Sequence, residues 1–453
     1  MTSKKIKFKS FIFLLLLFLF VSSGVYAADD LIRKFYGAPV IENCDDNNNE
    51  GCIANLKVKK NCIGCNLQNT RFNQLALRKA NLEKAKLNYA SWNKVDLQES
   101  NLKTSELKNI KLTNSNLSKA DLTGADLSYA EFQKVVLTEA NLSSVKAIGV
   151  KFDSVILKNA NLDQADFTNA SLNRAVLTGA ILDQALFFKS QLEAADLSKT
   201  SMIGANLTKA NLEKANLEKA NFIGAIFKEA NLSGANLKGT NLKAADFEKA
   251  NLSGIKFQKA RLSRANFTGA NLKGADLEGA FLSKINFTDA NLSEVNLTGA
   301  NLTGAILVRT NFNGAILNDA ILNDANLEQA KLTGASFEQA NLIQANFENS
   351  VLIGANFKNA NLSNAFFYKA DLRESVLTGA NLTDASFKKA RLEGANLSFA
   401  DLTNTNFFSA YLERAKFISA IILNTNLNKA AMQNAKWLKG QRCKPGSVGK
   451  CIY

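Results

Sequence analysis

The residues of this chain with the greatest potential for chemistry are six cysteines, which lie towards its two ends. They are Cys44, Cys52, Cys62, Cys65, Cys443 and Cys451. Thiolates act as nucleophiles, redox centres and metal ligands, whereas paired cysteines cross-link a fold. Cys44 and Cys52 enclose seven residues, and so do Cys443 and Cys451. This equal spacing favours these two disulfide pairs, although six cysteines allow many other connectivities.

Other motifs that could support chemistry are weak or missing. Residues 45–50 form an acidic loop, Asp-Asp-Asn-Asn-Asn-Glu, whose oxygens could ligate Ca²⁺. The loop lacks the spacing and the glycine of an EF-hand, so we interpret it as a polar turn closed by Cys44 and Cys52. The chain has no histidine, the commonest general base and zinc ligand, and no glycine-rich phosphate-binding motif. We therefore expect no enzyme, no cofactor and no metal site.

The elements that would have to position any site follow a period of five residues. From Leu67 to Trp437 an apolar residue, mostly Leu or Phe, occupies every fifth position without a break in register. Five residues advance an α-helix by about 140° beyond a full turn, so these residues would not share one helix face. Along a flat strand an odd period places successive residues on opposite faces. A chain that bends at a corner every five residues keeps them all inward, which predicts a coiled solenoid.

The residues around each central apolar position also repeat. A small residue, usually Ala, lies two positions before the centre, and Asn or Asp lies one position before it, as in Ala80-Asn81-Leu82. Polar residues or Gly follow the centre. With this A(D/N)Lxx unit, the chain resembles the pentapeptide-repeat proteins over about 370 of its 453 residues. The resemblance implies a right-handed quadrilateral β-helix, in which the central and the small residues both face inward.

The phenylalanines indicate independently that each coil has four sides. Between 167 and 407, ten of the thirteen central positions that differ by multiples of twenty are Phe, against five of the other 36 central positions. The ten are Phe167, Phe187, Phe227, Phe247, Phe267, Phe287, Phe347, Phe367, Phe387 and Phe407. A coil of twenty residues, or four pentapeptides, stacks these rings along one inner wall. About 18 to 19 coils at a spacing of about 4.8 Å would form a rod of roughly 90 Å.

One repeat departs from the pattern, because Ala147 stands at a central position. Val145, Val150 and Val155 occupy the neighbouring small-residue positions and would restore the lost core volume. A bulge that turns Ile148 inward is the alternative. We interpret this repeat as a structural irregularity and not as a site.

The N-terminus predicts a secretory signal peptide at residues 1–27. Lysines at positions 4, 5, 7 and 9 precede an apolar run from Phe11 to Val21, and Val25-Tyr26-Ala27 offers small residues for cleavage after Ala27. The apolar run is short for a membrane span, so an uncleaved anchor is the weaker alternative. We expect an exported bacterial protein, periplasmic or extracellular.

Residues 28–61 and 438–453 flank the repeats at 62–437 and would close the ends of the coil. Open ends expose unpaired strand edges, so we interpret the two segments as an N-terminal and a C-terminal cap, each with cysteines. Cys62 falls on a central position and Cys65 on a small-residue position, so both would face inward. A redox CxxC motif requires an exposed thiol, which favours a structural role for these two residues. The last segment resembles the tails of other exported members of the family.

The formal charge of the chain is +15, and removal of the four lysines of the signal peptide (15 − 4) leaves +11. Lysine and glutamate are interleaved along the repeats, and no long block is strongly basic. Nucleic-acid binders concentrate positive charge on one face. We therefore expect a mixed, soluble surface and no nucleic-acid partner.

The candidate binding surfaces are outward positions where large apolar side chains replace polar ones. Single apolar residues are normal on protein surfaces, so we consider only those that form groups. These groups are Val136, Ile156 and Val176 on three consecutive coils of one side, Leu186 with Phe188 and Phe366 with Tyr368 outside the phenylalanine wall, and Ile203 with Ile223 on another side. They are the first places to look for a partner.

These features favour a non-enzymatic binding or scaffold protein of the cell envelope, which acts through the outer sides of a rigid rod. Its partner would be another protein or an envelope component, and dimer formation is an alternative that the sequence leaves undecided. The resemblance supplies an alternative, because some pentapeptide-repeat proteins imitate duplex DNA and bind DNA gyrase. That role requires an acidic, cytosolic rod, whereas this chain is positive and carries a signal peptide. A self-assembling element that stacks end to end is a third hypothesis, disfavoured by the capped ends.

Overall fold

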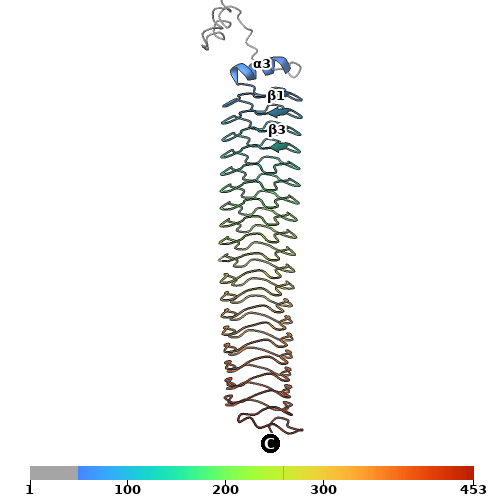
Figure 1. Cartoon of the computed structure of the whole chain (residues 1–453), viewed down its shortest axis with the longest axis vertical. Coiled ribbons are helices and arrows are strands. Elements are labelled where there is room, and N and C mark those ends of the chain that lie inside the picture. Colours follow the sequence, from blue (N-terminus) through green and yellow to red (C-terminus); the bar gives the residue numbers. More distant parts are fainter. Residues whose placement is uncertain (1–48, 259, 453) are drawn as a thin grey trace, which may run out of the picture.

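The computed structural model describes residues 49–258 and 260–452, which wind into a straight stack of coils (Figure 1). Parallel bridges join the residue before each centre to the residue twenty positions later, from Asn61 with Asn81 to Lys416 with Lys436. Each coil therefore contains four pentapeptides, and the chain forms the predicted right-handed quadrilateral β-helix. The predicted signal peptide, Cys44 and most of the acidic loop lie outside the described residues.

Each pentapeptide repeats one pattern of hydrogen bonds. The Leu82 amide donates to the carbonyl of Asn101 on the next coil at 2.7 Å, and the Lys84 amide to that of Lys103 at 2.9 Å. The next coil returns a bond, because the Asn101 amide donates to the Ala80 carbonyl at 2.9 Å. The residue two positions after the centre, here Lys84, has a positive φ of 57° and turns the chain at the corner. This turn keeps every central side chain inward.

We number the four sides in chain order. Side 1 contains Leu82, side 2 Leu87, side 3 Trp92 and side 4 Leu97, each with the residues at multiples of twenty positions from it. Regular strands occur on side 3 in the first coils, where β1 (Arg71–Asn73), β2 (Ser91–Asn93), β3 (Lys111–Thr113) and β4 (Glu131–Gln133) form a parallel sheet in the order β1-β2-β3-β4. Phe72 pairs with Trp92 in this register.

The core is a continuous column of central and small residues. Phe347, Phe367 and Phe387 on side 2 stack with ring centroids 4.8 and 4.5 Å apart. Phe357 reaches across from side 4 and packs edge-on against Phe347, at 5.9 Å. The predicted aromatic wall is therefore present, and rings from the opposite side wedge against it. Ala147 is fully buried at its central position and its amide donates to Asp166 as in a regular coil, so the bulge alternative was wrong.

The two ends of the rod are covered differently. Helix α3 (Asn49–Lys59) lies over the first coil (Figure 1). Its Cys52 and Leu56, four residues apart on one helix face, are fully buried against the core. At the other end, a segment held by a disulfide between Cys443 and Cys451 pairs antiparallel with the last coil. No helix among the described residues is long and apolar enough to cross a membrane.

Candidate functional site

The stripe of Val136, Ile156 and Val176 lies on side 4. The three residues are bridged directly, Val136 to Ile156 and Ile156 to Val176, so the structure brings them together as one column. Only Ile156 is exposed, at 38%, while the two valines are half-buried. Asn116 and Asp196 continue the column at its ends with polar side chains. The stripe is a short apolar strip with little accessible surface.

Ile203 and Ile223 lie one above the other on side 1, where the amide that follows Ile203 donates to the Ile223 carbonyl at 3.0 Å. Ile203 is 36% exposed and Ile223 is half-buried. The Ile203 amide is bound by the carboxylate of Asp183 at 2.8 Å. This pair is smaller than the stripe and lies on a different side of the rod.

Leu186 and Phe188 lie on side 2, outside the wall of stacked rings. Leu186 is 42% exposed, between Asp166 and Asn206 of the neighbouring coils. Phe188 is half-buried, and the ammonium of Lys189 lies 5.2 Å from its ring centroid. An aromatic residue followed by lysine at the corner thus forms a local cation–π contact.

Further along side 2, around Phe366 and Tyr368, lysines again lie next to an exposed aromatic ring, and here more residues take part. Phe366 is 47% exposed, and Lys369 and Lys389 place their ammonium groups 5.2 and 5.8 Å from the Tyr368 ring centroid. An open depression of about 390 Å³ begins at Tyr368. The residues that line it are Tyr368, Lys388, Lys389, Asn406, Phe408 and Asn426.

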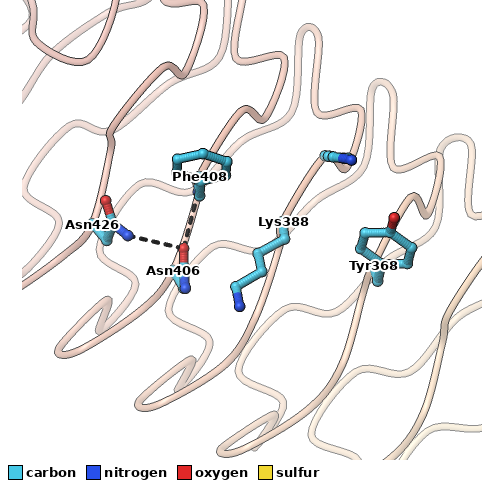
Figure 2. Close-up of a pocket in the computed structure, with 6 residues that line it drawn as sticks. Tyr368, Lys388, Asn406, Phe408 and Asn426 are labelled. Carbon is cyan, nitrogen blue, oxygen red and sulfur yellow. Dashed lines mark hydrogen bonds between the residues drawn. The ribbon is translucent and has the colours of Figure 1, made fainter.

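The depression is built by the register of the coils. Tyr368, Lys388 and Phe408 each follow a central residue of side 2 on three successive coils, and Figure 2 shows Lys388 between the two rings. The two rings lie two coil spacings apart, which corresponds to about 10 Å, and the coil of Lys388 lies between them. The side-chain oxygen of Asn406 fixes the floor, because it accepts bonds from the Phe408 amide at 3.0 Å and from Asn426 at 3.3 Å.

The charge on this part of side 2 has one sign. From Phe366 to Lys429 its outward positions hold four lysines and no Asp or Glu. We call this surface the aromatic–lysine patch; it comprises Phe366, Tyr368, Lys369, Lys388, Lys389, Phe408 and Lys429. Lys429 places its ammonium 5.4 Å from the Phe408 ring centroid.

The lysines of the patch differ from others on the same side of the rod. Lys228, also on side 2, is paired with Asp246 at 3.3 Å and Glu248 at 3.1 Å. Within residues 49–258 and 260–452, none of the four patch lysines forms an ion pair. Their charge is therefore available to an anionic partner, while the rings offer flat apolar surface beside it.

Sequence reasoning found Phe366 and Tyr368 but missed the lysines and Phe408. The signal was present, since positions 368, 388 and 408 differ by twenty and share one side of a four-sided coil. Lysine is an ordinary residue at an outward position, so only apolar replacements of polar residues stand out there. Phe281, which is 55% exposed on side 1, is an isolated apolar residue and belongs to no group.

A cysteine cluster lies at the other end of the rod. The sulfurs of Cys52, Cys62 and Cys65 lie within 4.8 Å of one another, all buried, and they are the one group in the described ranges that meets this test for a metal site. Cys62 and Cys65 are joined by a disulfide, which leaves them without the thiolates that a metal requires. As expected from the register, both side chains point inward. Their disulfide cross-links the start of the first coil, which lies beneath α3.

The chain matches two family models for pentapeptide repeats. The model described as "Pentapeptide repeats (8 copies)" matches residues 61–143, 148–222, 225–334 and 395–434, and the model "Pentapeptide repeat region" matches residues 320–397. Together they cover well over half of the chain. No curated protein sequence matches it.

Several solved structures are similar to parts of the rod. A trypsin-treated variant of QnrB1, a plasmid-mediated fluoroquinolone resistance protein, is 21% identical, with 39% of this chain and 88% of that chain covered and a TM-score of 0.28. HetL, a pentapeptide-repeat protein involved in the regulation of heterocyst differentiation in the cyanobacterium Nostoc sp. strain PCC 7120, is 27% identical, with 63% and 92% covered and a TM-score of 0.17. A thylakoid-lumen protein of Arabidopsis thaliana is 34% identical, with 23% and 66% covered and a TM-score of 0.10.

Proposed function

This chain belongs to the pentapeptide-repeat family, and we propose that it is a non-enzymatic binding or scaffold protein of the bacterial cell envelope. The rod engages an acidic partner protein through the aromatic–lysine patch on side 2. No chemistry is needed for this role, because recognition rests on the shape and charge of a rigid surface.

The observation that carries the proposal is the placement of Lys388 between the rings of Tyr368 and Phe408 (Figure 2). Aromatic and basic residues are typical of binding hot spots, and complementary charge accelerates association. A lysine kept only for solubility would gain from a neighbouring carboxylate, as Lys228 does from Glu248. The patch lacks such carboxylates, which is consistent with a partner that supplies them.

Export is the second part of the proposal. It rests on the basic and apolar N-terminal segment with its cleavage site after Ala27. The disulfides Cys62–Cys65 and Cys443–Cys451 agree with it, because disulfides persist in oxidising compartments.

Two other functions have less support. A rod that imitates DNA requires a negative surface, whereas this chain has a formal charge of +15. Assembly into long fibres requires two open ends, whereas α3 lies over the first coil. The similarity to QnrB1 covers 39% of this chain and adds no support to the DNA-imitating function.

The binding proposal is tested with a photo-reactive amino acid at position 408 in intact cells. We expect crosslinking to an acidic protein, with the crosslink lost in a Lys388→Glu, Lys389→Glu double variant. The matched control is Lys238→Glu with Lys243→Glu, two exposed lysines on sides 4 and 1 without ion pairs in the described chain. Absence of any crosslink from position 408, or equal loss in both double variants, would overturn the assignment.

The export proposal is tested on the same cells. N-terminal sequencing of the purified protein should find Ala28 as the first residue, and fractionation should recover it outside the cytoplasm. Recovery of the unprocessed chain from the cytoplasm would refute export and restore the gyrase hypothesis.

A further inference from the structure

The C-terminal cap covers only half of the last coil. Residues after Gly440 pair antiparallel with sides 3 and 4, through the bridges Ala431 with Val448 and Lys436 with Arg442. The Met432 amide donates to the Ser447 carbonyl and the Asn434 amide to the Cys443 carbonyl, each at 2.9 Å. Sides 1 and 2 of the same coil have no corresponding bridge to residues 437–452. Gly449 of the cap lies against the backbone of Asn428 and Lys429 at the end of side 2, and its amide donates to the Ala430 carbonyl at 2.9 Å. We call the uncovered part before it, residues 420–427, the terminal edge.

The hydrogen bonds of the coil above show which backbone groups of the terminal edge lack a partner. There, the amides of Leu402, Asn404 and Phe407 donate to carbonyls of the last coil. The equivalent donors of the terminal edge are the amides of Ile422, Asn424 and Leu427, and the equivalent acceptors are the carbonyls of Ala420 and Thr425. Within the described chain, none of these five groups has a backbone partner. The edge thus presents three donors and two acceptors in the spacing of a β-ladder.

The side chains around the terminal edge are apolar and partly uncovered. Ile421 and Leu423 are 55% and 57% exposed. Ile422 and Leu427 stand at central positions but are only half-buried, whereas Leu402 and Phe407 in the coil above are fully buried. A strand laid along the edge would bury these four side chains and pair the free backbone groups.

The chain from Ile421 to the last residue carries only positive charge, with six Lys or Arg and no Asp or Glu. Lys429 lies next to the edge, while Asp401 of the coil above is bridged to Ile421. Long-range attraction at this end therefore favours a segment rich in carboxylates.

We propose that the terminal edge binds an extended, acidic peptide segment of a partner protein, which adds to the last coil as one more β-strand. The site is separate from the aromatic–lysine patch and does not rest on its proposed function, although Lys429 borders both. A second copy of this chain fits the edge less well, because two such ends would bring donors against donors and cations against cations. A polysaccharide or lipid surface has no backbone that matches the ladder of donors and acceptors.

The test uses the full chain and a fluorescein-labelled peptide of alternating valine and glutamate. Amide hydrogen exchange followed by mass spectrometry should show protection of residues 421–430 when this peptide is added, and the peptide in which lysine replaces glutamate should give none. Ile421→Asp with Leu423→Asp should weaken binding by about tenfold or more, since two exposed apolar side chains no longer contribute. Ile321→Asp is the matched control, because Ile321 occupies the same position on side 1, five coils earlier, and is 39% exposed.

Three results would overturn the proposal. The first is no protection of residues 421–430 by the acidic peptide. The second is protection of these amides without peptide in a species that sediments as an end-to-end dimer, which would make a second copy the occupant. The third is equal protection by dextran sulfate, which would make the surface a general anion site. Unchanged exchange in the other coils of the double variant verifies that it folds.

Discussion

Phe367 and Phe387 stack with ring centroids 4.5 Å apart and planes within 4° of parallel, on successive coils of side 2. Phe387 also stacks on Phe407 at 5.1 Å, so its ring is held on both faces. In a solenoid each coil contacts only its neighbours, and a defect in one coil weakens its interfaces with the two beside it. The stacked rings are therefore a local measure of how strongly adjacent coils are joined.

Replacement of Phe387 tests this relationship. Phe387→Ala should destabilise the C-terminal coils by about 3 to 5 kcal/mol, because it leaves a cavity between two rings. Phe387→Leu should cost about 1 kcal/mol, since Leu307 and Leu327 already occupy this column. Urea unfolding followed by hydrogen exchange at residues 360–420 measures both. Equal effects of the two substitutions would show that the stacking contributes little.

Asparagine side chains form a second ladder, on the outside of side 3. From Asn211 to Asn311 each amide nitrogen donates to the side-chain oxygen one coil earlier, and Asn251 does so to Asn231 at 3.0 Å and receives a bond from Asn271 at 3.2 Å. Asn251→Ala breaks both bonds and should cost about 1 to 2 kcal/mol. Lys256→Ala, at the equivalent position on side 4, should have little effect on the urea midpoint. A larger effect of the lysine substitution would contradict this assignment.

Charged side chains replace asparagine on side 3 near the N-terminal end. Glu131 accepts from Lys151 at 2.8 Å and pairs with Lys111 at 3.2 Å, and hydrogen bonds from these two lysines lower the pKa of Glu131 below its usual value. A lowered carboxyl pKa contributes stability that is present above the unfolded pKa, about 4.3, and is lost as pH falls through the folded pKa. Thermal unfolding of Glu131→Gln and of the parent should therefore differ at pH 7 and converge once the pH is below the folded pKa of Glu131. The difference should shrink in high salt, because the carboxylate is partly exposed to solvent.

The fold could be predicted because its information is local and repeated. Each pentapeptide, such as Ala80-Asn81-Leu82, specifies its own corner, inward side chain and ladder, and the column of phenylalanines specifies the number of sides. Helix α3 was not predicted, since its residues lie outside the repeat and its only periodic signal is Cys52 with Leu56. The helix is stabilised by packing against the open end of the first coil. This is a tertiary contact, so the local sequence of the helix does not predict it.

The candidate site was predicted only in part. Apolar residues in polar positions identified Phe366 and Tyr368, because their type is unusual there. Lys388 is an ordinary surface residue, and its importance comes from its neighbours one coil away on either side. The terminal edge was not predicted either, because the sequence does not indicate how many sides of the last coil the C-terminal segment covers.

The disulfide between Cys443 and Cys451 holds the cap that does form, and its removal should open sides 3 and 4 of the last coil. Cys443 is fully buried, and its amide donates to Ala435 while its carbonyl accepts from Asn434. Closure of such a short loop contributes about 2 to 3 kcal/mol in the chain-entropy model. Reduction, or Cys443→Ser with Cys451→Ser, should therefore raise hydrogen exchange at Met432 and Asn434, whose acceptors lie in the cap. The amides of Leu412 and Arg414, one coil above, bond to the last coil itself and should keep their protection; equal loss in both coils would mean that the cap and the last coil unfold as one unit.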